Sequence, residues 1–355
     1  MKNILLFTVA TLFIFSFYAC PYSSPKRQFP NAYFPDTITN MSSLNSVYDD
    51  INMALMIKFS SNLILFSSNR NSEGKQFDIV GDKVSFLWHE TSGDLATDDT
   101  DGQSLKYLQY LLTKTQTEAD EYGPYGTIYN DDLYLFYANN SEGTNNMYLL
   151  IYRECMDHYY DQVIADELIE GPFKIPSLSN PNSNEAYLSF HTNKMPADDF
   201  NRFNTASDSI NLIFCSDSLG QYDIYSLPLT GTEFSKEVFT ATIPHKKQLL
   251  STINSEYNDR CPNVCGNFMV FSSDRPGGLG GYDFYYSIFE NGSWSEAINF
   301  GAPINSAYDE YRALAIKAWQ YENDLLIFSS NRPGGIGGFD IYYTGIDEMP
   351  AAIWE

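Results

Sequence analysis

One phrase recurs along this chain and constrains its fold more than any other feature. Residues 271–286 read FSSDRPGGLGGYDFYY, and residues 328–343 read FSSNRPGGIGGFDIYY. Weaker copies begin at Phe66, Phe136 and Phe214, and the last three copies are spaced 57 residues apart. Self-similarity at a fixed spacing is typical of repeat architectures. A conspicuous residue within the phrase is therefore first a repeat residue and only then a candidate catalyst.

Each copy of the phrase predicts a hairpin with a structured tip. In the fifth copy, residues 325–328 form an apolar run of strand length, continuous enough to be buried on both faces. Residues 329–338 are rich in Ser, Asn, Pro and Gly, which favour tight loops, and residues 339–343 resume a strand rich in aromatic and β-branched residues. With a strand-like stretch on either side, each repeat predicts the four antiparallel strands of a propeller blade.

Five copies predict an all-β fold, a five-bladed β-propeller with four antiparallel strands per blade. Insertions at about 81–119 and 191–209 account for the longer spacing of the first copies. Residues 37–50 parallel residues 297–310 at a constant offset of 260. We therefore expect the N-terminal strand to complete the last blade, which closes the ring and removes open sheet edges.

The repeat also resembles a known family. The phrase F-S-S-[DN]-R-P-G-G-x-G-G-[FY]-D-[FI]-Y, preceded by N-S-x-Y-[DN]-[DE], closely resembles the TolB-like, WD-repeat-like propeller repeat of bacterial periplasmic proteins. Together with Phe17-Tyr18-Ala19-Cys20, which resembles a lipoprotein cleavage box, the chain resembles a propeller-repeat lipoprotein of Bacteroidota type. The resemblance covers roughly residues 37–344. It implies a propeller fold and a binding scaffold, and it leaves the partner open, because one fold serves many functions.

The N-terminal residues predict export and a lipid anchor. Residues 1–19 combine Lys2 with an apolar core of signal-peptide length. The following Cys20 stands in a sequence that resembles a lipoprotein cleavage box, although ordinary signal-peptidase cleavage stays open. The Pro-rich residues 20–36 are expected to form a tether, and residues 37–355 a single propeller domain. The expected location is the periplasm, anchored by lipid to the outer membrane.

The net charge of the chain limits the classes of partner that it can bind. The formal net charge of −24 argues against nucleic acid and against membrane contacts other than the lipid anchor. Basic proteins, cations and neutral glycans remain possible partners.

Cys215 and Cys261 are expected near the same rim of the propeller, so they form either a disulfide or two buried thiols. The state of Cys155 and Cys265 is left open as well.

Acidic residues recur where the entry loop meets the first strand of a blade. Strand alternation places this loop on the same face as the hairpin tip. The candidate binding face therefore contains Asp49, Asp50, Asp120, Glu121, Asp259, Asp309 and Glu310. A ring of carboxylates could bind a cation or a basic segment. Because the acids recur in at least four blades, whereas a catalytic acid is needed once, we favour a structural role for them.

Other repeat residues are expected to stabilise the hairpins. Arg70, Arg275 and Arg332 should brace the loops, and Asp78, Asp223, Asp283 and Asp340 should accept hydrogen bonds from the hairpin tips. The first insertion departs from the repeat and adds Trp88 and His89 to the candidate binding face. The four histidines show no metal-ligand spacing, and there is no nucleophile elbow or phosphate loop, so neither a metal nor a cofactor is expected.

These observations lead to two hypotheses about function. The first is a non-catalytic periplasmic lipoprotein whose propeller binds a protein or an envelope component. The alternative is a carbohydrate-binding or glycan-degrading five-bladed propeller that uses acidic residues at the channel mouth, where two carboxylates could act on a glycosidic bond. Of the two, the sequence favours the first, and therefore a protein that is not an enzyme.

Overall fold

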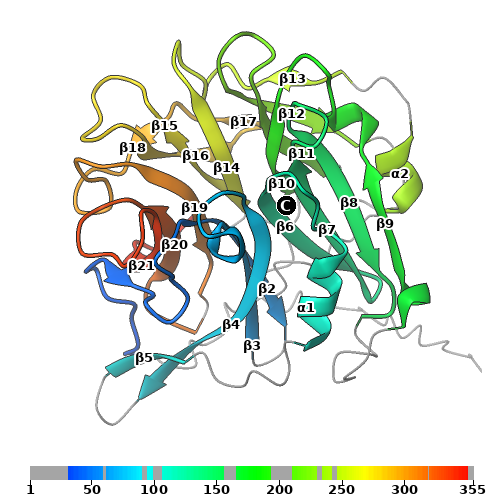
Figure 1. Ribbon diagram of the computed structural model, residues 1–355. Helices are drawn as coiled ribbons and strands as arrows, with labels where there is room; N and C mark the ends of the chain where they lie inside the picture. Colours follow the sequence, from blue (N-terminus) through cyan, green and yellow to red (C-terminus); the bar gives the residue numbers. More distant parts are fainter. Residues whose placement is uncertain are drawn as a thin grey trace, which may run out of the picture.

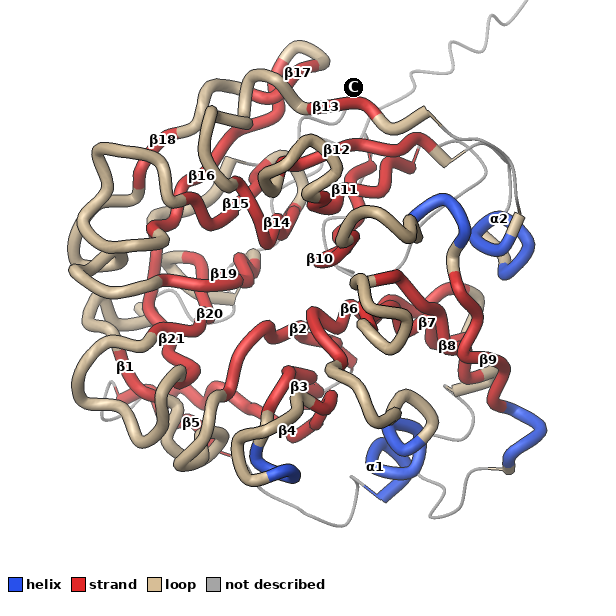
Figure 2. The backbone as a smooth tube through the Cα atoms, turned by 45° about the horizontal axis from the view of Figure 1, so that its top comes forward, coloured by secondary structure: helices blue, strands red, loops and turns tan. Residues whose placement is uncertain are grey.

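The computed structural model describes residues 31–58, 61–89, 94–98, 106–155, 165–192, 210–229, 234–241, 246–318 and 320–350. Five antiparallel sheets surround a central axis, as Figure 1 shows. The innermost strands β2, β6, β10, β14 and β19 each contact the next one around the ring, and β19 returns to β2. Figure 2 shows these five strands lining the centre of the molecule. The predicted five-bladed propeller is confirmed.

The first three blades run outward from the axis in chain order. Blade one contains β2 (Asp50–Lys58), β3 (Ser61–Ser68), β4 (Asp78–His89) and β5 (Asp94–Asp98). Blade two contains β6 (Glu121–Tyr129), β7 (Asp132–Asn139), β8 (Asn146–Tyr152) and β9 (Ile169–Lys174). Blade three contains β10 (Glu185–Thr192), β11 (Ile210–Ser216), β12 (Asp223–Pro228) and β13 (Gln248–Leu249).

The last two blades contain the best copies of the repeat. Blade four contains β14 (Asp259–Cys265), β15 (Phe268–Ser273), β16 (Asp283–Glu290) and a divided outer strand, β17 (Ser293–Trp294) and β18 (Ile298–Asn299). Blade five contains β19 (Glu310–Ile316), β20 (Asp324–Ser330), β21 (Asp340–Ile346) and β1 (Thr39–Asn40).

Strand β1 closes the ring, as its offset from blade four predicted. Thr39 pairs with Tyr343 and Asn40 with Tyr342 at the outer edge of blade five. Residues that precede β1 in the sequence also contact blade five. Ala32 and Phe34 are buried, and the Gly345 N–H donates to the Pro35 carbonyl at 2.7 Å. The folded unit therefore begins by Ala32, within the stretch that was assigned to the tether. Residues 1–30, including Cys20, lie outside the described residues.

Short helices lie in the connections between strands. They are α1 (Lys106–Thr113), α2 (Lys236–Thr240) and the 3₁₀ turns η1 (Arg70–Ser72), η2 (Asp166–Leu168) and η3 (Pro176–Leu178). The first expected insertion extends β4 and contributes β5 and α1, and α1 buries Leu108, Leu111 and Leu112 against blades one and two. No helix in the described ranges is long and apolar enough to cross a membrane.

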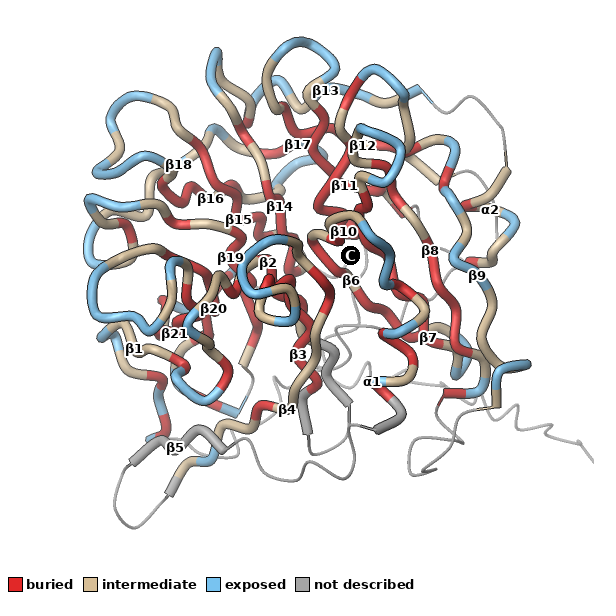
Figure 3. Tube along the Cα trace, viewed as in Figure 1, coloured by how far each residue is buried: buried red, intermediate tan, exposed pale blue. Residues whose placement is uncertain are grey.

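The core lies between neighbouring blades and combines aliphatic with aromatic residues. The five repeat phenylalanines, Phe66, Phe136, Phe214, Phe271 and Phe328, are all essentially buried. Figure 3 shows the burial of the strands and the exposure of the loops at their ends. The apolar second strand of each blade is covered on both faces because each blade packs between two others. The loops at the blade ends are free to specialise on this scaffold.

Every inner strand contains a bulge near its start. The pairing register shifts after Ile51, Tyr122, Ala186, Arg260 and Tyr311, one such shift in each blade. The next residue adopts a left-handed backbone conformation, at Asn52, Gly123, Tyr187, Cys261 and Arg312. Four of these five are not glycine, and such residues are uncommon in this conformation. A bulge redirects side chains, and here Asn52 and Arg312 of two different blades both reach Tyr187 of a third.

Candidate functional site

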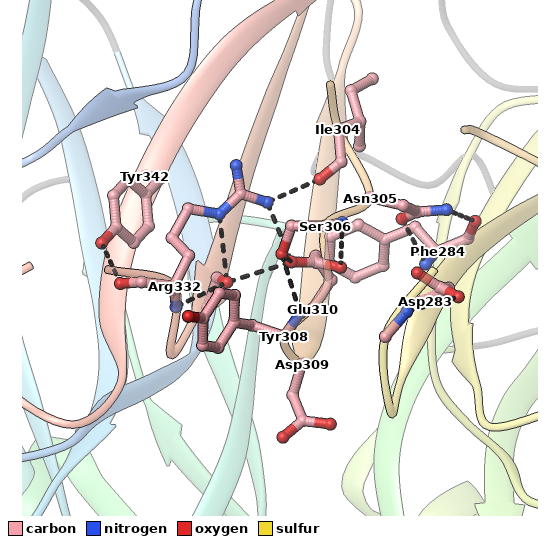
Figure 4. A network of polar contacts seen from close by, with 12 residues as sticks. Asp283, Phe284, Ile304, Asn305, Ser306, Tyr308, Asp309, Glu310, Arg332 and Tyr342 are labelled. Carbon is pink, nitrogen blue, oxygen red and sulfur yellow. Dashed lines mark hydrogen bonds and ion pairs between the residues drawn. The ribbon is translucent and has the colours of Figure 1, made fainter. Parts of the chain in front are cut away.

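A layer of buried acids begins the inner strands. It consists of Asp50, Glu121, Glu185, Asp259 and Glu310, each at most 2% exposed. In three blades an arginine of the hairpin pairs with the acid, and Figure 4 shows the version in blade five. There the Arg332 Nη2 lies 2.9 Å from Glu310 and donates to the Ile304 carbonyl at 2.6 Å. The acid therefore joins the entry loop to the hairpin of its own blade.

Arg70 and Arg275 repeat the same arrangement. Each donates through Nη2 to the acid and to a carbonyl of the entry loop, and through Nε to a serine of the second strand. An arginine can hold three acceptors at once because its planar guanidinium carries five donors. The guanidiniums of Arg70, Arg275 and Arg332 also lie over Phe66, Phe271 and Phe328, respectively. These arginines brace the loops.

Blades two and three hold their acid without an arginine. The Glu121 carboxylate accepts hydrogen bonds from Thr117 and Asn139, both at 2.7 Å. Burial raises its pKa to about 7, although these two hydrogen bonds act against burial. Burial likewise raises the pKa of Glu185, which accepts from Ser183 and Ser216. Neutral and ionised forms of Glu121 are therefore both populated near pH 7.

The residue before each acid belongs to a second layer, the inter-blade clasp. In every blade this residue pairs with the residue that follows the second strand, and one partner is Asp while the other is Asn. The five pairs are Asp49–Asn69, Asp120–Asn140, Asn184–Asp217, Asn258–Asp274 and Asp309–Asn331. The amide donates to the carboxylate at 2.6–3.4 Å. An Asp–Asp pair would place two carboxylates in contact, and none of the five pairs is of that kind.

The clasp also joins each blade to the one before it. The Asp309 Oδ1 accepts the Tyr282 N–H at 2.9 Å, and the Asp120 Oδ1 accepts the Phe77 N–H at 2.9 Å. Asp49 closes the ring in the same way by accepting the Phe339 N–H at 2.9 Å. The acids predicted for the channel mouth therefore form hydrogen bonds within the loops, both in the layer of buried acids and in the inter-blade clasp. They do not converge on an open acidic ring.

The other predicted residues lie apart from the mouth. Asp283 accepts the Leu279 N–H at 2.6 Å and Asp340 accepts the Ile336 N–H at 2.5 Å, both within their hairpin tips. Asp78 and Asp223 instead accept side-chain amides of their loops. Trp88 contacts the ring of Tyr33 and not the central cavity. The side chain of His89 and residues 193–209 of the second insertion lie outside the described residues.

A cavity of about 410 Å³ opens at the axis, and we call it the central cup. Its walls are mostly aromatic. It is lined by Ile51, Phe77, Tyr122, Asn145, Tyr187, Arg260, Tyr282, Asp309, Tyr311 and Phe339. Most of these come from two repeat positions, the residue after the buried acid and the residue before the third strand. Sequence analysis missed both positions, because an aromatic residue at the start of a strand reads as ordinary strand composition.

Arg260 is the cation of this cup. Its guanidinium lies 4.1 Å from the ring centroid of Tyr222 and 5.1 Å from that of Tyr311. Tyr187 and Tyr282 lie within 6 Å on the other sides, at 5.8 and 5.9 Å. Burial acts to lower the pKa of Arg260, whereas the nearby Tyr311 and Tyr187 act to raise it. The resulting pKa of Arg260 lies above its ordinary value. The side chain is therefore a permanent cation held among tyrosines.

Below the cup, the left-handed residues fill the channel. Arg312 is fully buried and donates to the Pro262 carbonyl at 2.9 Å. Its guanidinium lies 5.6 Å from the Tyr187 ring, and Asn52 donates to the Tyr187 hydroxyl at 3.4 Å. Cys261 is buried beside them, and burial raises the pKa of its thiol. The cup is thus a closed-bottomed pocket and not an open pore.

None of the four described cysteines lines the cup, and neither does His191. Cys155 is buried, and Cys215, Cys261 and Cys265 are buried thiols, so of the two alternatives for Cys215 and Cys261 the structure has the thiols. His191 packs against Phe289 and Trp294, and burial lowers its pKa to about 4. In the described part of the chain, no cluster of His, Cys, Asp and Glu is arranged to hold a metal ion.

Comparison with solved structures places this architecture among known propellers. A thermostable family-43 glycoside hydrolase matches with a TM-score of 0.51 and 12% sequence identity, over 89% of this chain and 98% of the other. The endo-arabinase of Bacteroides thetaiotaomicron VPI-5482 matches with a TM-score of 0.50 and 13% identity, over 86% of this chain and all of the other. No protein-family model matches the chain, and no curated protein matches it in sequence.

These comparisons correct two expectations. The sequence favoured a non-catalytic scaffold for a protein or envelope component, and it favoured a protein that is not an enzyme. The comparisons contradict both preferences, because the two solved structures described above are a glycoside hydrolase and an endo-arabinase. The propeller fold stands, and the glycan alternative is the hypothesis that the findings favour.

Proposed function

We propose that this protein acts on a glycan and binds it in the central cup. One observation carries the proposal: an axial pocket with six aromatic rings and one arginine on a propeller shared with glycoside hydrolases. Aromatic faces offer a large, rigid contact area for the apolar face of a sugar ring. The cup volume of about 410 Å³ also lies within the range of small-molecule pockets.

The proposal changes which residues contact the sugar. The sequence assigned this role to the acids of the channel mouth, but of those acids only Asp309 lines the cup, and the others are held in loop contacts. The residues one position further along the chain, such as Tyr122 and Tyr311, line the cup instead. Tyr282 and Phe339 complete the wall from neighbouring hairpins. Sugar recognition would thus depend on stacking and on polar tips, rather than on a ring of charge.

Cleavage of the bound glycan makes a further demand. Glycoside hydrolysis ordinarily uses two carboxylates on either side of the scissile bond. Asp309 is the carboxylate that lines the cup in the described part of the chain, and the Tyr282 N–H and the Asn331 amide fix its position. It is the candidate general base or nucleophile. A hydrolysis assay of Asp309→Asn tests this role separately from binding.

A glycan array with the folded protein tests the proposal. We expect retention of a defined set of oligosaccharides, and about tenfold weaker binding by Tyr282→Ala, because an aromatic contact of about 1.4 kcal/mol corresponds to tenfold in affinity. The matched control is Tyr33→Ala, which removes an aromatic ring that is 57% exposed and lies outside the cup. An array without any retained glycan would contradict the proposal, and so would equal binding by Tyr282→Ala and the wild type.

The proposed place of this activity is the periplasmic side of the outer membrane. The support is the signal-like residues 1–19 and Cys20 in a sequence that resembles a lipoprotein cleavage box. We expect incorporation of labelled fatty acid into the wild-type protein and its loss in Cys20→Ser. Labelling that persists in Cys20→Ser would contradict the anchor.

A further inference from the structure

Arg260 breaks the repeat at the position that lines the cup. The residues that follow the buried acid in the other blades are Ile51, Tyr122, Ala186 and Tyr311. Apolar or aromatic residues therefore serve this position in four blades, and only blade four has a charge there. A residue that the scaffold needs recurs, as the acids and clasp residues do. A residue that occurs once calls for a reason other than the fold.

Arg260 also lacks the partner that the other loop arginines have. Arg70, Arg275 and Arg332 each form an ion pair with a buried acid. Across the ranges that the structure describes, Arg260 forms no ion pair with a carboxylate, and its Nε has no hydrogen-bond partner. Arg260 is partly buried. Partial burial of a cation without a counter-charge costs free energy, and tyrosine rings compensate for only part of that cost. An anionic ligand would supply the missing partner.

The surroundings of Arg260 favour a carboxylate on a sugar. Four tyrosines restrict the guanidinium, so its donors are held in position before a ligand arrives. A planar guanidinium matches a planar carboxylate through two parallel hydrogen bonds. The aromatic walls of Tyr282 and Phe339 stand in the same pocket for the sugar ring. The two features together fit a ring that carries its own carboxylate.

We infer that the central cup selects an acidic glycan, with Arg260 binding the carboxylate of a uronic-acid residue. The inference rests on the proposed function and narrows it to one class of glycan. The net charge of −24 repels anions at long range. Selection must therefore be local, and added salt should weaken that repulsion more than it weakens a buried ion pair. Affinity for an acidic glycan should not fall steeply as salt increases.

Titration calorimetry with matched oligosaccharides tests the inference. The probes are an oligouronate, the same oligosaccharide with its carboxyl groups reduced to alcohols, and a sulfated neutral oligosaccharide. We expect the wild type to bind the oligouronate about 30-fold more tightly than its reduced counterpart. Arg260→Met should abolish this preference, and Arg260→Lys should keep part of it because a lysine keeps the charge but loses the fork.

The control is Arg153→Met, which removes an arginine that pairs with Asp132 and Glu170 on blade two, away from the cup. Its preference for the oligouronate should equal that of the wild type. Equal binding of acidic and reduced oligosaccharides would overturn the inference, as would a preference that survives in Arg260→Met or a preference for the sulfated probe. In each of these outcomes the glycan-binding proposal stands. A glycan array without any retained glycan, by contrast, removes the proposed function itself.

Discussion

Two adjacent positions at the start of each inner strand behave in opposite ways. The first is Asp or Glu in all five blades, buried and hydrogen-bonded within its own loop. The second is Ile51, Tyr122, Ala186, Arg260 or Tyr311, different in chemistry from blade to blade, and four of the five line the cup. The comparison teaches that this chain repeats where it needs structure and varies where it lines the cup.

The inter-blade clasp supports the same conclusion within one chain. Blades one, two and five place Asp before the inner strand and Asn after the second strand, whereas blades three and four reverse the two. Either partner can be the Asp because the contact requires only one carboxylate and one amide. The contact itself therefore needs no carboxylate at a fixed position, so a catalytic role for Asp309, the clasp residue that lines the cup, would be additional to the clasp. The clasp is a structural contact that recurs five times.

The largest loss of stability is expected from a substitution that disrupts the packing between blades. A Cβ at Gly280 would lie 1.9 Å from the Tyr308 carbonyl oxygen of the next blade. Gly280→Ala should therefore lower the free energy of unfolding by about 3 kcal/mol or more. Gly277→Ala, in the same hairpin tip, meets no atom within 4 Å and places alanine at a φ of 99°. We expect it to cost only about 1–2 kcal/mol. Urea unfolding measures both, and equal losses would contradict the close contact.

The next effect tests the complementarity of the clasp. Asn140→Asp places a second carboxylate against Asp120, and we expect a loss of about 1–3 kcal/mol in unfolding free energy. Adding Asp120→Asn recreates the order found in blades three and four, so the double variant should recover most of the loss. A double-mutant cycle by urea unfolding measures the coupling. Losses that simply add would show that the two side chains act independently.

Much of the fold could be predicted because the repeat carries it. The hairpins, the shared face of acid and arginine, and the closure by β1 all follow from copies that align by residue number. Blade three was only partly predicted. Its entry sequence, Ser183-Asn184-Glu185, is two residues shorter than the matching stretch from Ser255 to Asp259, so Glu185 did not appear in the aligned pattern. The structure restores the match, since Ser183 bonds Glu185 as Ser255 bonds Asp259.

The cup could not be predicted in the same way. Its walls combine Phe77, Tyr187 and Phe339, which are far apart in the sequence and meet only when five blades close around an axis. The clearest signal for Arg260 was its departure from the residues at the equivalent positions. That signal becomes readable only after the buried acids are recognised as structural. The recurring carboxylates lie mostly in the layer beside the cup, and of those that the sequence singled out only Asp309 lines it.

A smaller effect concerns the pH dependence of stability. Burial raises the pKa of Glu121 from 4.5 to about 7 in the folded protein. A raised carboxyl pKa stabilises the fold below the unfolded pKa, and this contribution is lost as pH rises through the folded pKa. Between about pH 4.5 and 7 the wild type should thus lose stability that Glu121→Gln does not lose. Melting temperatures at pH 5.5 and 8 check this.

The control for this pH effect is Glu118→Gln, which changes an exposed carboxylate three residues away in the same entry loop. Its melting temperature should fall between pH 5.5 and 8 as much as that of the wild type. The prediction concerns the difference between the two pH values, so a uniform loss of stability in Glu121→Gln does not affect it. A fall in Glu121→Gln as large as in the wild type would contradict the raised pKa.

The most direct test compares two arginines of blade four under the same substitution. Arg275→Met leaves Asp259 buried without its partner and should cost about 3 kcal/mol of unfolding free energy. Its folded fraction should bind the oligouronate like the wild type. Arg260→Met should leave stability nearly unchanged and weaken oligouronate binding about 30-fold. If Arg260→Met instead binds like the wild type and unfolds as readily as Arg275→Met, then Arg260 is another loop brace and the central claim is wrong.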